Sequence, residues 1–193
     1  LLFDTFVPAT AVALPVASLV TRMQSAAQRI SDLASTDALT GLLNLRTFEE
    51  VLQQEHRKAE RFNRPYTLAV IDVDNLAQVN EMLGHEAGSQ VLGTVASAIT
   101  RSIRSSDVAA RLGGDQFVGL LAGAGTQTGA PIAQRLRNNV YAGTVSVANR
   151  LIRASVNVGT ANYPEDHLYP KELMILADQR MQQDRALRRP AAG

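Results

Sequence analysis

The chain has 193 residues and a formal net charge of +1 at pH 7, so no strong electrostatic field indicates nucleic-acid binding. Its hydrophobic content of 46% is ordinary for a globular protein with a buried core. The absence of cysteine excludes a disulfide framework and thiolate metal sites, and it fits a reducing compartment. These bounds predict one domain with an extension, and no DNA or RNA partner.

The first twenty residues are almost uncharged and carry only Asp4. Their length is marginal for a membrane span, and two prolines interrupt them. The segment also lacks the basic start of a signal peptide. For residues 1–20 we expect either the apolar tail of an upstream folded sensor or the end of a membrane helix. In the second case, Arg22 and Arg29 would suit the cytoplasmic side. Because the chain does not begin with Met, we expect it to be part of a longer protein.

A signalling helix is predicted next, because apolar residues recur at three- and four-residue spacing within residues 21–36. Such a helix could pair with a second copy of itself. A polar break at residues 35–37 offers a helix N-cap and marks a domain boundary. We therefore expect the main domain over residues 37–189, followed by a short tail at residues 190–193.

The main domain alternates between helix and strand patterns. Apolar residues at helical spacing predict helices at about residues 45–62, 76–83, 91–103, 132–140 and 171–187. Short apolar or alternating runs predict strands at residues 66–72, 107–112, 117–122 and 153–163. The segment GAGTQTGAP, residues 123–131, is predicted to be a loop.

Without the additional helices, this order reads β-α-β-β-α-β, which is the ferredoxin-like order. The predicted fold class is therefore α+β, with helices on one face of a central, mainly antiparallel sheet. Nucleotide cyclases and polymerase palm domains have this kind of architecture.

Acidic residues stand at two places that this topology makes neighbours. Asp72 ends the first strand, and Asp115 lies in the turn of the central hairpin. Two carboxylates at a sheet edge suit a hard cation such as Mg²⁺, which takes its other ligands from water and phosphate oxygens. Gly113 and Gly114 would let a base or a phosphate approach the backbone closely. The alternative is a plain flexible turn, with Asp72 as a strand-end helix cap.

The same residues belong to sequence motifs that resemble the GGDEF family, the diguanylate cyclases of bacterial signalling. The resemblance covers about residues 37–187, and the spacing between its motifs agrees throughout. The matching segments are DALTGLLNLRTF at residues 37–48, IDVDNLAQVNEMLGHEAG at 71–88, RLGGDQF at 111–117 and LADQRMQQDR at 176–185.

The resemblance implies a reaction and an assembly. Two GTP molecules, one on each of two subunits, would condense to cyclic di-GMP and two pyrophosphates, aided by Mg²⁺ or Mn²⁺. Each 3′-hydroxyl would attack the α-phosphate of the other nucleotide. A homodimer is therefore implied. We expect a cytoplasmic protein, tethered to the inner membrane if the upstream segment spans it.

The resemblance also implies roles by position. Asp72, the Val73 carbonyl and Asp115 would hold metal, and Asp115 would help to deprotonate the attacking hydroxyl. Asp72 and Asp115 are thus the catalytic candidates. His85, taken alone, could equally be a helix-end histidine. The positions expected to contact the nucleotide are Asn80 at the guanine, His85, Gly113, Gly114, Ser89 and Arg185.

Several family positions are altered. Gln116 replaces the second acid of the signature and has neither charge nor useful basicity. Ser89 replaces an Asp that grips the guanine edge, and Ala77 replaces a Lys next to the phosphates. Arg185 replaces a phosphate-binding Lys but keeps its charge. Together these changes favour weakened GTP binding and turnover, whereas the retained metal pair favours activity.

A second binding motif lies just upstream of the signature. The spacing from RSSD, Arg104 to Asp107, to the glycines resembles the RxxD inhibitory site of the family, where product dimers bind. Arg135 resembles its supporting arginine. Arginine offers a fork to guanine and phosphate, and aspartate accepts from guanine nitrogens. The alternative for Arg104 and Asp107 is a surface ion pair of little energetic value.

Three functions therefore remain open from the sequence. We favour a GGDEF signalling domain with weakened or lost catalysis and a retained cyclic di-GMP site. The second is an active, product-inhibited cyclase. The third is a non-catalytic dimerisation domain that passes a signal from an upstream sensor.

Overall fold

The computed structural model describes residues 34–147 and 150–188, and those from Thr36 onward form one compact unit. The apolar tail predicted at residues 1–20, the signalling helix before the polar break and the tail at 190–193 lie outside the described residues. No helix among the described residues is long and apolar enough to cross a membrane.

The element order agrees with the sequence prediction and adds a two-residue strand before the first long helix and a short hairpin before the last long strand. The strands are β1 (Leu43–Asn44), β2 (Tyr66–Val73), β3 (Val108–Gly113), β4 (Gln116–Ala122), β5 (Thr144–Val147), β6 (Arg150–Arg153) and β7 (Val156–Tyr163). The helices are α2 (Leu45–Phe62), α3 (Leu76–Leu83), α4 (His85–Ser102), α5 (Thr126–Ala142) and α6 (Pro170–Arg188).

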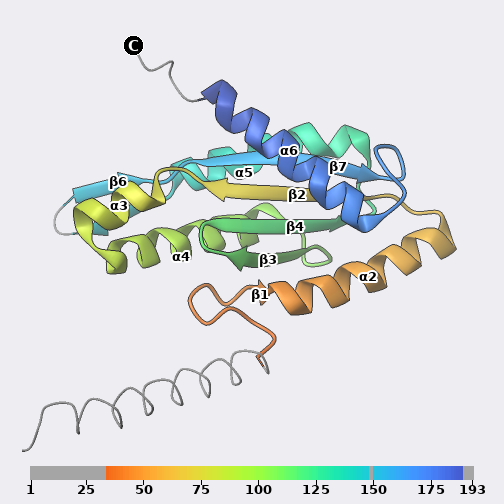
Figure 1. Cartoon of the computed structure of the whole chain (residues 1–193), viewed down its shortest axis with the longest axis horizontal. Coiled ribbons are helices and arrows are strands. Elements are labelled where there is room, and N and C mark those ends of the chain that lie inside the picture. Colours follow the sequence, from red (N-terminus) through yellow and green to blue (C-terminus); the bar gives the residue numbers. More distant parts are fainter. Residues whose placement is uncertain (1–33, 148–149, 189–193) are drawn as a thin grey trace, which may run out of the picture. The chain divides into compact units, whose positions relative to one another are not determined.

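The central sheet has the strand order β1-β3-β4-β2-β7 (Figure 1). Every neighbouring pair is antiparallel except β1 with β3. The four long strands thus have the ferredoxin-like order, and the predicted α+β class with a mainly antiparallel sheet is confirmed. β5 and β6 pair only with each other and form a separate hairpin.

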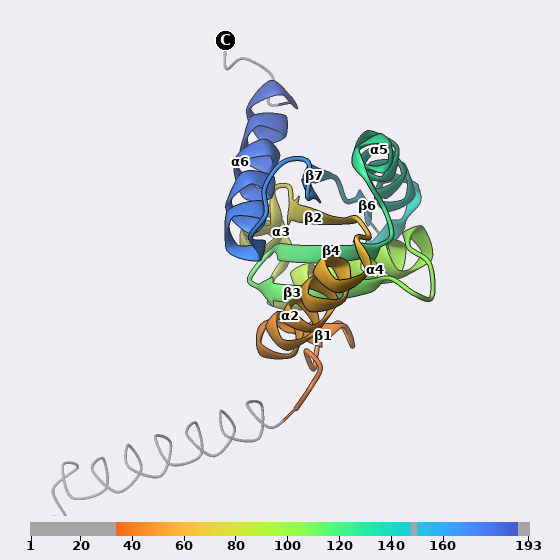
Figure 2. The same ribbon diagram turned by 90° about the vertical axis from the view of Figure 1, so that its right-hand side faces the viewer.

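The prediction that helices cover one face of the sheet is wrong, because helices pack on both faces (Figure 2). One apolar cluster joins β2, α4 and α5 through Ile71, Val95 and Leu136. The other joins β2 to α2 and α6 and includes Leu68 and Leu173. Successive side chains of β2 point to opposite faces, so β2 is buried along its whole length.

Three predicted boundaries also differ from the structure. α5 begins at Thr126, so the predicted loop ends at Gly125, and Pro131 lies inside the helix. α4 begins at His85, directly after Gly84, because one polar turn precedes its apolar face. The predicted last strand is divided, since β6 ends at Arg153 and β7 begins at Val156.

α6 lies very close to the backbone of β7. A Cβ atom at Gly159 would overlap the backbone of α6 at Ala177 and Met181. Both of these α6 residues are fully buried. The glycine therefore sets how closely, and in which register, α6 packs against the sheet.

Side chains of α6 and of the loop before it cover the outer edge of β7. The Val158 amide donates to Asp184 Oδ2 at 3.0 Å, and the Thr160 carbonyl accepts from Arg180 Nη1 at 2.8 Å. Asp166 is held by Arg180, with Nη2 and Oδ1 2.8 Å apart. Hydrogen bonds from Arg180 lower the pKa of Asp166 below its usual range.

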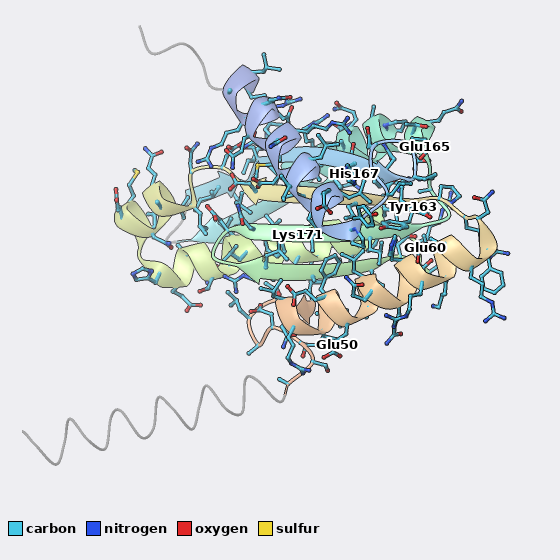
Figure 3. All side chains as sticks on the ribbon, turned by 45° about the vertical axis from the view of Figure 1, so that its right-hand side comes forward. Glu50, Glu60, Tyr163, Glu165, His167 and Lys171 are labelled. Carbon is cyan, nitrogen blue, oxygen red and sulfur yellow. The ribbon has the colours of Figure 1, made fainter. Side chains whose placement is uncertain are left out.

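An aromatic cluster lies near the end of the sheet where α2 ends and the β7–α6 loop begins (Figure 3). Tyr66 and Tyr163 stack with ring centroids 5.1 Å apart. Nδ1 of the buried His56 lies 3.3 Å from the Tyr66 hydroxyl. Burial raises the pKa of Tyr66 above its usual value. This cluster contributes to packing, because α3 lies at the other end of β2 (Figure 1).

Two glycine substitutions test the packing of α6. We expect Gly159→Ala to lower the free energy of unfolding by about 2–3 kcal/mol, because the new methyl group would overlap the α6 backbone. Gly93→Ala on α4 is the matched control, since its Cβ meets no atom within 4 Å. It should raise stability by about 0.5–1 kcal/mol. Urea unfolding measures both, and an unchanged stability of Gly159→Ala would contradict the packing described.

Candidate functional site

The end of β2 lies beside the turn between β3 and β4, as the sequence predicts. The residue in register with Asp72 is Gln116, however, and not Asp115. β3 continues to Gly113 and β4 begins at Gln116, so the turn itself is only Gly114 and Asp115. The Asp115 carbonyl accepts a hydrogen bond from the Val73 amide at 3.0 Å, which fixes the turn against β2.

The two predicted metal carboxylates approach the sheet end from different sides. Asp72 alternates with Leu68 and Val70, whose side chains pack on the α6 side of the sheet. Asp115 instead lines a pocket with residues of α3 and α4. The carboxylates are near enough for the Asp115 charge to contribute to the raised pKa of Asp72. The predicted proximity of the two acids is therefore present, although they do not face each other directly.

Gly113, the last residue of β3, and Gly114 in the turn adopt conformations that other residues rarely take. Gly113 has φ +134° and Gly114 has φ +54°, and a Cβ on either would point into open space. The backbone here is thus bare on its outer side. This agrees with the prediction that a base or phosphate can approach it closely.

Arg111 holds the turn in place from within the same motif. Its Nη2 donates to the Gly114 carbonyl at 2.6 Å, and its Nη1 lies 3.2 Å from Asp37 Oδ2. Asp37 also accepts from the amide and the hydroxyl of Thr40, at 2.9 and 2.6 Å. Burial opposes ionisation of Asp37, but these hydrogen bonds outweigh it and lower its pKa. Arg111 thus joins the first and third matching segments, a link that sequence spacing did not reveal.

A pocket of about 410 Å³ gathers most of the predicted nucleotide residues. Asn80 and His85 reach it from α3 and the start of α4, and Ser89 lies one turn further along α4. Asp72, Gly113 and Arg185 do not line it. The lining residues are Leu39, Leu76, Ala77, Asn80, His85, Gly88, Ser89, Leu92, Arg111, Gly114 and Asp115.

Asn80 lines this pocket and carries a hydrogen-bond acceptor that the described residues leave unsatisfied. Its Oδ1 atom is buried and has no hydrogen-bond partner within the described part of the chain. A Cβ at Gly88 would overlap the Asn80 side chain, so the glycine makes room for it. A buried polar atom without a partner is costly, and a donor on a ligand, such as a base amino group, would satisfy it.

Asp72 lies beneath Arg185 of α6. The side chain of Asp72 is 3% exposed, and its Oδ1 lies 3.2 Å from Arg185 Nη1. Within the described residues, that oxygen nevertheless receives no hydrogen bond of good geometry. Burial raises the pKa of Asp72, and the charges of Asp115 and Asp74 add to the rise, whereas Arg185 opposes it.

Asp74, the second acid of the IDVDN segment, is fixed by structural contacts. Its two carboxylate oxygens accept from Asn157 Nδ2 at 2.6 Å and from Ser155 Oγ at 2.9 Å. Its amide donates to the Ser155 carbonyl at 2.9 Å. Asp74 therefore anchors the β2–α3 loop to β7, a role that the sequence did not indicate.

The oxygen donors at this end of the sheet fit a hard divalent cation. No group of three or more His, Cys, Asp or Glu side chains in residues 34–147 and 150–188 is arranged so that it could hold a metal ion by itself. Mg²⁺, however, is usually held by one or two carboxylates together with water and substrate phosphates. Asp72, with an oxygen free of hydrogen bonds, and Asp115 provide such a pair. The Val73 carbonyl as a further ligand stays a prediction.

The predicted RxxD residues form a second, separate pocket. Arg104, Asp107 and Arg135 line a cavity of about 140 Å³ between the α4–β3 turn, β4 and α5. Asp107 Oδ2 accepts from the Arg104 amide at 2.8 Å, and the Asp107 amide donates to the Arg104 carbonyl at 3.0 Å. The alternative of a surface ion pair is not observed, since none of the ion pairs in the described residues joins Arg104 to Asp107.

The fold, the turn between β3 and β4 and the two pockets agree with the family that the sequence motifs suggest. Residues 34–190 match the family described as "Diguanylate cyclase, GGDEF domain". The chain belongs to the GGDEF family.

Curated relatives support the same assignment over part of their length. The chain is 34% identical over 148 residues to the uncharacterized protein YhcK of Bacillus subtilis, covering 76% of this chain and 41% of that protein. It is 33% identical over 156 residues to the probable diguanylate cyclase DgcT of Escherichia coli, covering 80% and 34%. The chain thus spans between a third and two fifths of these two relatives.

Solved structures confirm the fold. The GGDEF domain of TpbB (YfiN) from Pseudomonas aeruginosa is 32% identical, with a TM-score of 0.74, covering 79% of this chain and 89% of that one. The GGDEF domain of DgcB from Caulobacter crescentus, solved in complex with c-di-GMP, is 28% identical, with a TM-score of 0.74 and coverage of 81% and 92%. The diguanylate cyclase SiaD from Pseudomonas aeruginosa, solved with its activator SiaC, is 27% identical, with a TM-score of 0.76 and coverage of 93% and 68%.

The raised pKa of Asp72 predicts a stabilising substitution at the site. A carboxyl whose pKa is raised by folding favours the native state only while it is protonated, so its ionised form costs stability at neutral pH. We expect Asp72→Asn to raise Tm by about 2–4 °C at pH 7. The gain should shrink as the pH falls towards the usual carboxyl range.

Asp74→Asn is the matched control, and it should lower Tm because Asp74 accepts hydrogen bonds from Asn157 and Ser155. Thermal unfolding followed by circular dichroism between pH 4 and pH 8 (our chosen range, from about the usual Asp value to about four units above it) compares both variants. A lower Tm for Asp72→Asn at every pH would contradict the expected cost of the buried charge.

Proposed function

We propose that this chain is a GGDEF signalling domain that binds cyclic di-GMP at the pocket of Arg104, Asp107 and Arg135, with weakened or lost cyclase activity. One observation carries the proposal: two separate segments of the chain bring these three side chains to one cavity. Neither arginine takes part in an ion pair among the described residues. Both charges therefore remain available to a ligand.

The chemistry of this pocket suits a guanine nucleotide. Guanidinium groups donate paired hydrogen bonds to phosphate oxygens and to the acceptor edge of guanine. Asp107 is held by the Arg104 amide, so its carboxylate is positioned before a ligand arrives. The complex of the DgcB GGDEF domain with c-di-GMP supports the ligand class.

The cyclase site keeps part of what GTP turnover would need. Asn80 offers an unpaired buried acceptor to the base, and the bare backbone of Gly114 gives room to the phosphates. A divalent ion held by Asp72 and Asp115 would stabilise charge on the phosphoryl group. Asp115 would accept the proton of the attacking hydroxyl.

Three changes weaken this site. Gln116 places a neutral amide where the family signature has an acid. This position lies beside Asp72, because the two residues are in register. Ser89 gives the pocket a neutral hydroxyl where a carboxylate would hold guanine, and Ala77 offers no cation to the phosphates. Each lost charged contact would cost roughly 1.5–3 kcal/mol.

The role of the domain in a longer protein belongs to the same proposal. The condensation uses one GTP on each of two subunits, so turnover would need a homodimer. We propose that an upstream sensor or membrane segment controls that pairing. If catalysis is lost entirely, the domain would pass on the cyclic di-GMP level that it senses.

Calorimetric titration with cyclic di-GMP tests the binding proposal. The wild-type protein should bind, and Arg104→Ala should bind about ten- to a hundredfold more weakly, because charged hydrogen bonds are lost. Arg101→Ala, an exposed arginine less than one turn earlier in α4, is the matched control and should bind like the wild type. The protein must first be stripped of any bound product. No binding to the stripped wild type would refute the proposal.

A cyclase assay with GTP and Mg²⁺ or Mn²⁺ tests the weakened catalysis. We expect the Ser89→Asp, Gln116→Glu double variant to form cyclic di-GMP at least about tenfold faster than the wild type, because two lost charged groups return. Asp115→Ala should abolish any product. A wild-type rate equal to that of the double variant, and lost in Asp115→Ala, would establish the active, product-inhibited cyclase instead.

A further inference from the structure

The ion pair between Arg185 and Asp72 involves the carboxylate that the proposed metal would need. Arg185 Nη1 lies 3.2 Å from Asp72 Oδ1, and the arginine side chain is 29% exposed whereas the aspartate is 3% exposed. The guanidinium therefore covers a buried carboxylate and also reaches solvent. A cation that approached Asp72 from the α6 side would meet Arg185 first.

The packing of α6 fixes Arg185 in this position. Arg185 follows the buried Met181 by four residues, so the two side chains lie on the same helix face. The α6 backbone at Met181 lies against Gly159 of β7, in the strand beside β2. The same contact that sets the register of α6 thus places a guanidinium over the end of β2.

None of the other groups described around Asp72 neutralises its charge, so Arg185 acts as its counter-ion. Asp115 and Asp74 are the acids whose charges act on Asp72. The next arginine along α6, Arg188, is paired with Asp184 Oδ1 at 2.7 Å. Gln116, directly in register with Asp72, is neutral. Among the described residues, one guanidinium, that of Arg185, therefore balances Asp72.

We propose that Arg185 is the resident counter-ion of Asp72 and excludes a divalent cation from it until the arginine moves onto the phosphates of a bound nucleotide. This rests on the proposed nucleotide site. The guanidinium has one carboxylate partner within the described residues and enough exposure to exchange it for phosphate oxygens. Metal binding at Asp72 is then coupled to the arrival of the nucleotide, which supplies both a new partner for the arginine and further ligands for the metal.

Two titrations on Arg185→Gln test this exchange. The first adds Mn²⁺ alone to nucleotide-free protein and measures free Mn²⁺ by electron paramagnetic resonance. The variant should bind Mn²⁺ at least about tenfold more tightly than the wild type, since the competing charge is gone. The second adds GTP in the presence of EDTA, where the variant should bind at least about tenfold more weakly.

Arg188→Gln is the matched control, because it removes an arginine from the next turn of α6 that pairs with Asp184 rather than Asp72. It should leave both affinities unchanged. Asp72→Asn should abolish the tighter Mn²⁺ binding when it is combined with Arg185→Gln. A merely structural role for Arg185 would not move the two affinities in opposite directions.

Equal Mn²⁺ affinities of the wild type and Arg185→Gln would overturn the proposal, and so would the absence of Mn²⁺ binding by both. If Arg185→Gln does not fold, Arg185→Lys should shift both affinities in the same directions by a smaller factor, because lysine keeps the charge and loses the fork. Cyclic di-GMP titration reports the Arg104 pocket separately, so its outcome does not depend on this exchange.

Discussion

The antiparallel register between β2 and β4 determines what the end of the sheet can do. It pairs Asp72 with Gln116 and leaves Asp115 in the turn. Side chains alternate along a strand. If β4 slipped by one residue against β2, each of its side chains would therefore point to the opposite face of the sheet. The observed register directs Asp72 towards α6 and Asp115 towards the pocket of α3 and α4. A ligand that used both carboxylates would thus have to bridge the sheet end.

Three part-buried ion pairs connect segments that lie far apart in the sequence. Arg111 joins the turn to Asp37, Arg185 joins α6 to β2, and the Arg137–Asp184 pair joins α5 to α6 at 3.1 Å. Loss of the arginine of such a pair would leave its carboxylate with little access to water, which is far more costly than loss of an exposed pair. The first and second pairs differ in how well their carboxylates are satisfied. Asp37 also accepts hydrogen bonds from Thr40, whereas Asp72 Oδ1 accepts none from the described part of the chain. The charge at Asp72 is the one that a ligand can still satisfy.

Much of this arrangement could be predicted from the sequence, because local patterns specify it. The spacing of Asn80, His85 and Ser89 in one motif places them around one helix junction, and the structure gathers them in one pocket. The contact of Arg185 with Asp72 could not be predicted, since it depends on how α6 packs against Gly159. Helices on both faces of the sheet could have been inferred, because YTLAVIDV is almost continuously apolar, the pattern of a strand covered on both sides. The β5–β6 hairpin left no clear signal, as its strands are short and no Asn-Gly or Asp-Gly pair marks its turn.

The covered edge of β7 has a consequence for how copies of this domain can meet. An open edge strand invites another chain to continue the sheet through its backbone. Here Asp184 and Arg180 occupy the backbone groups of Val158 and Thr160 that such a strand would use. The pKa of Asp184 is lowered, as burial is outweighed by its hydrogen bonds, so this cover persists even in mild acid. A second copy that met the domain at β7 would therefore have to associate through side-chain surfaces, which can separate and reassociate, and not by extending the sheet at this edge.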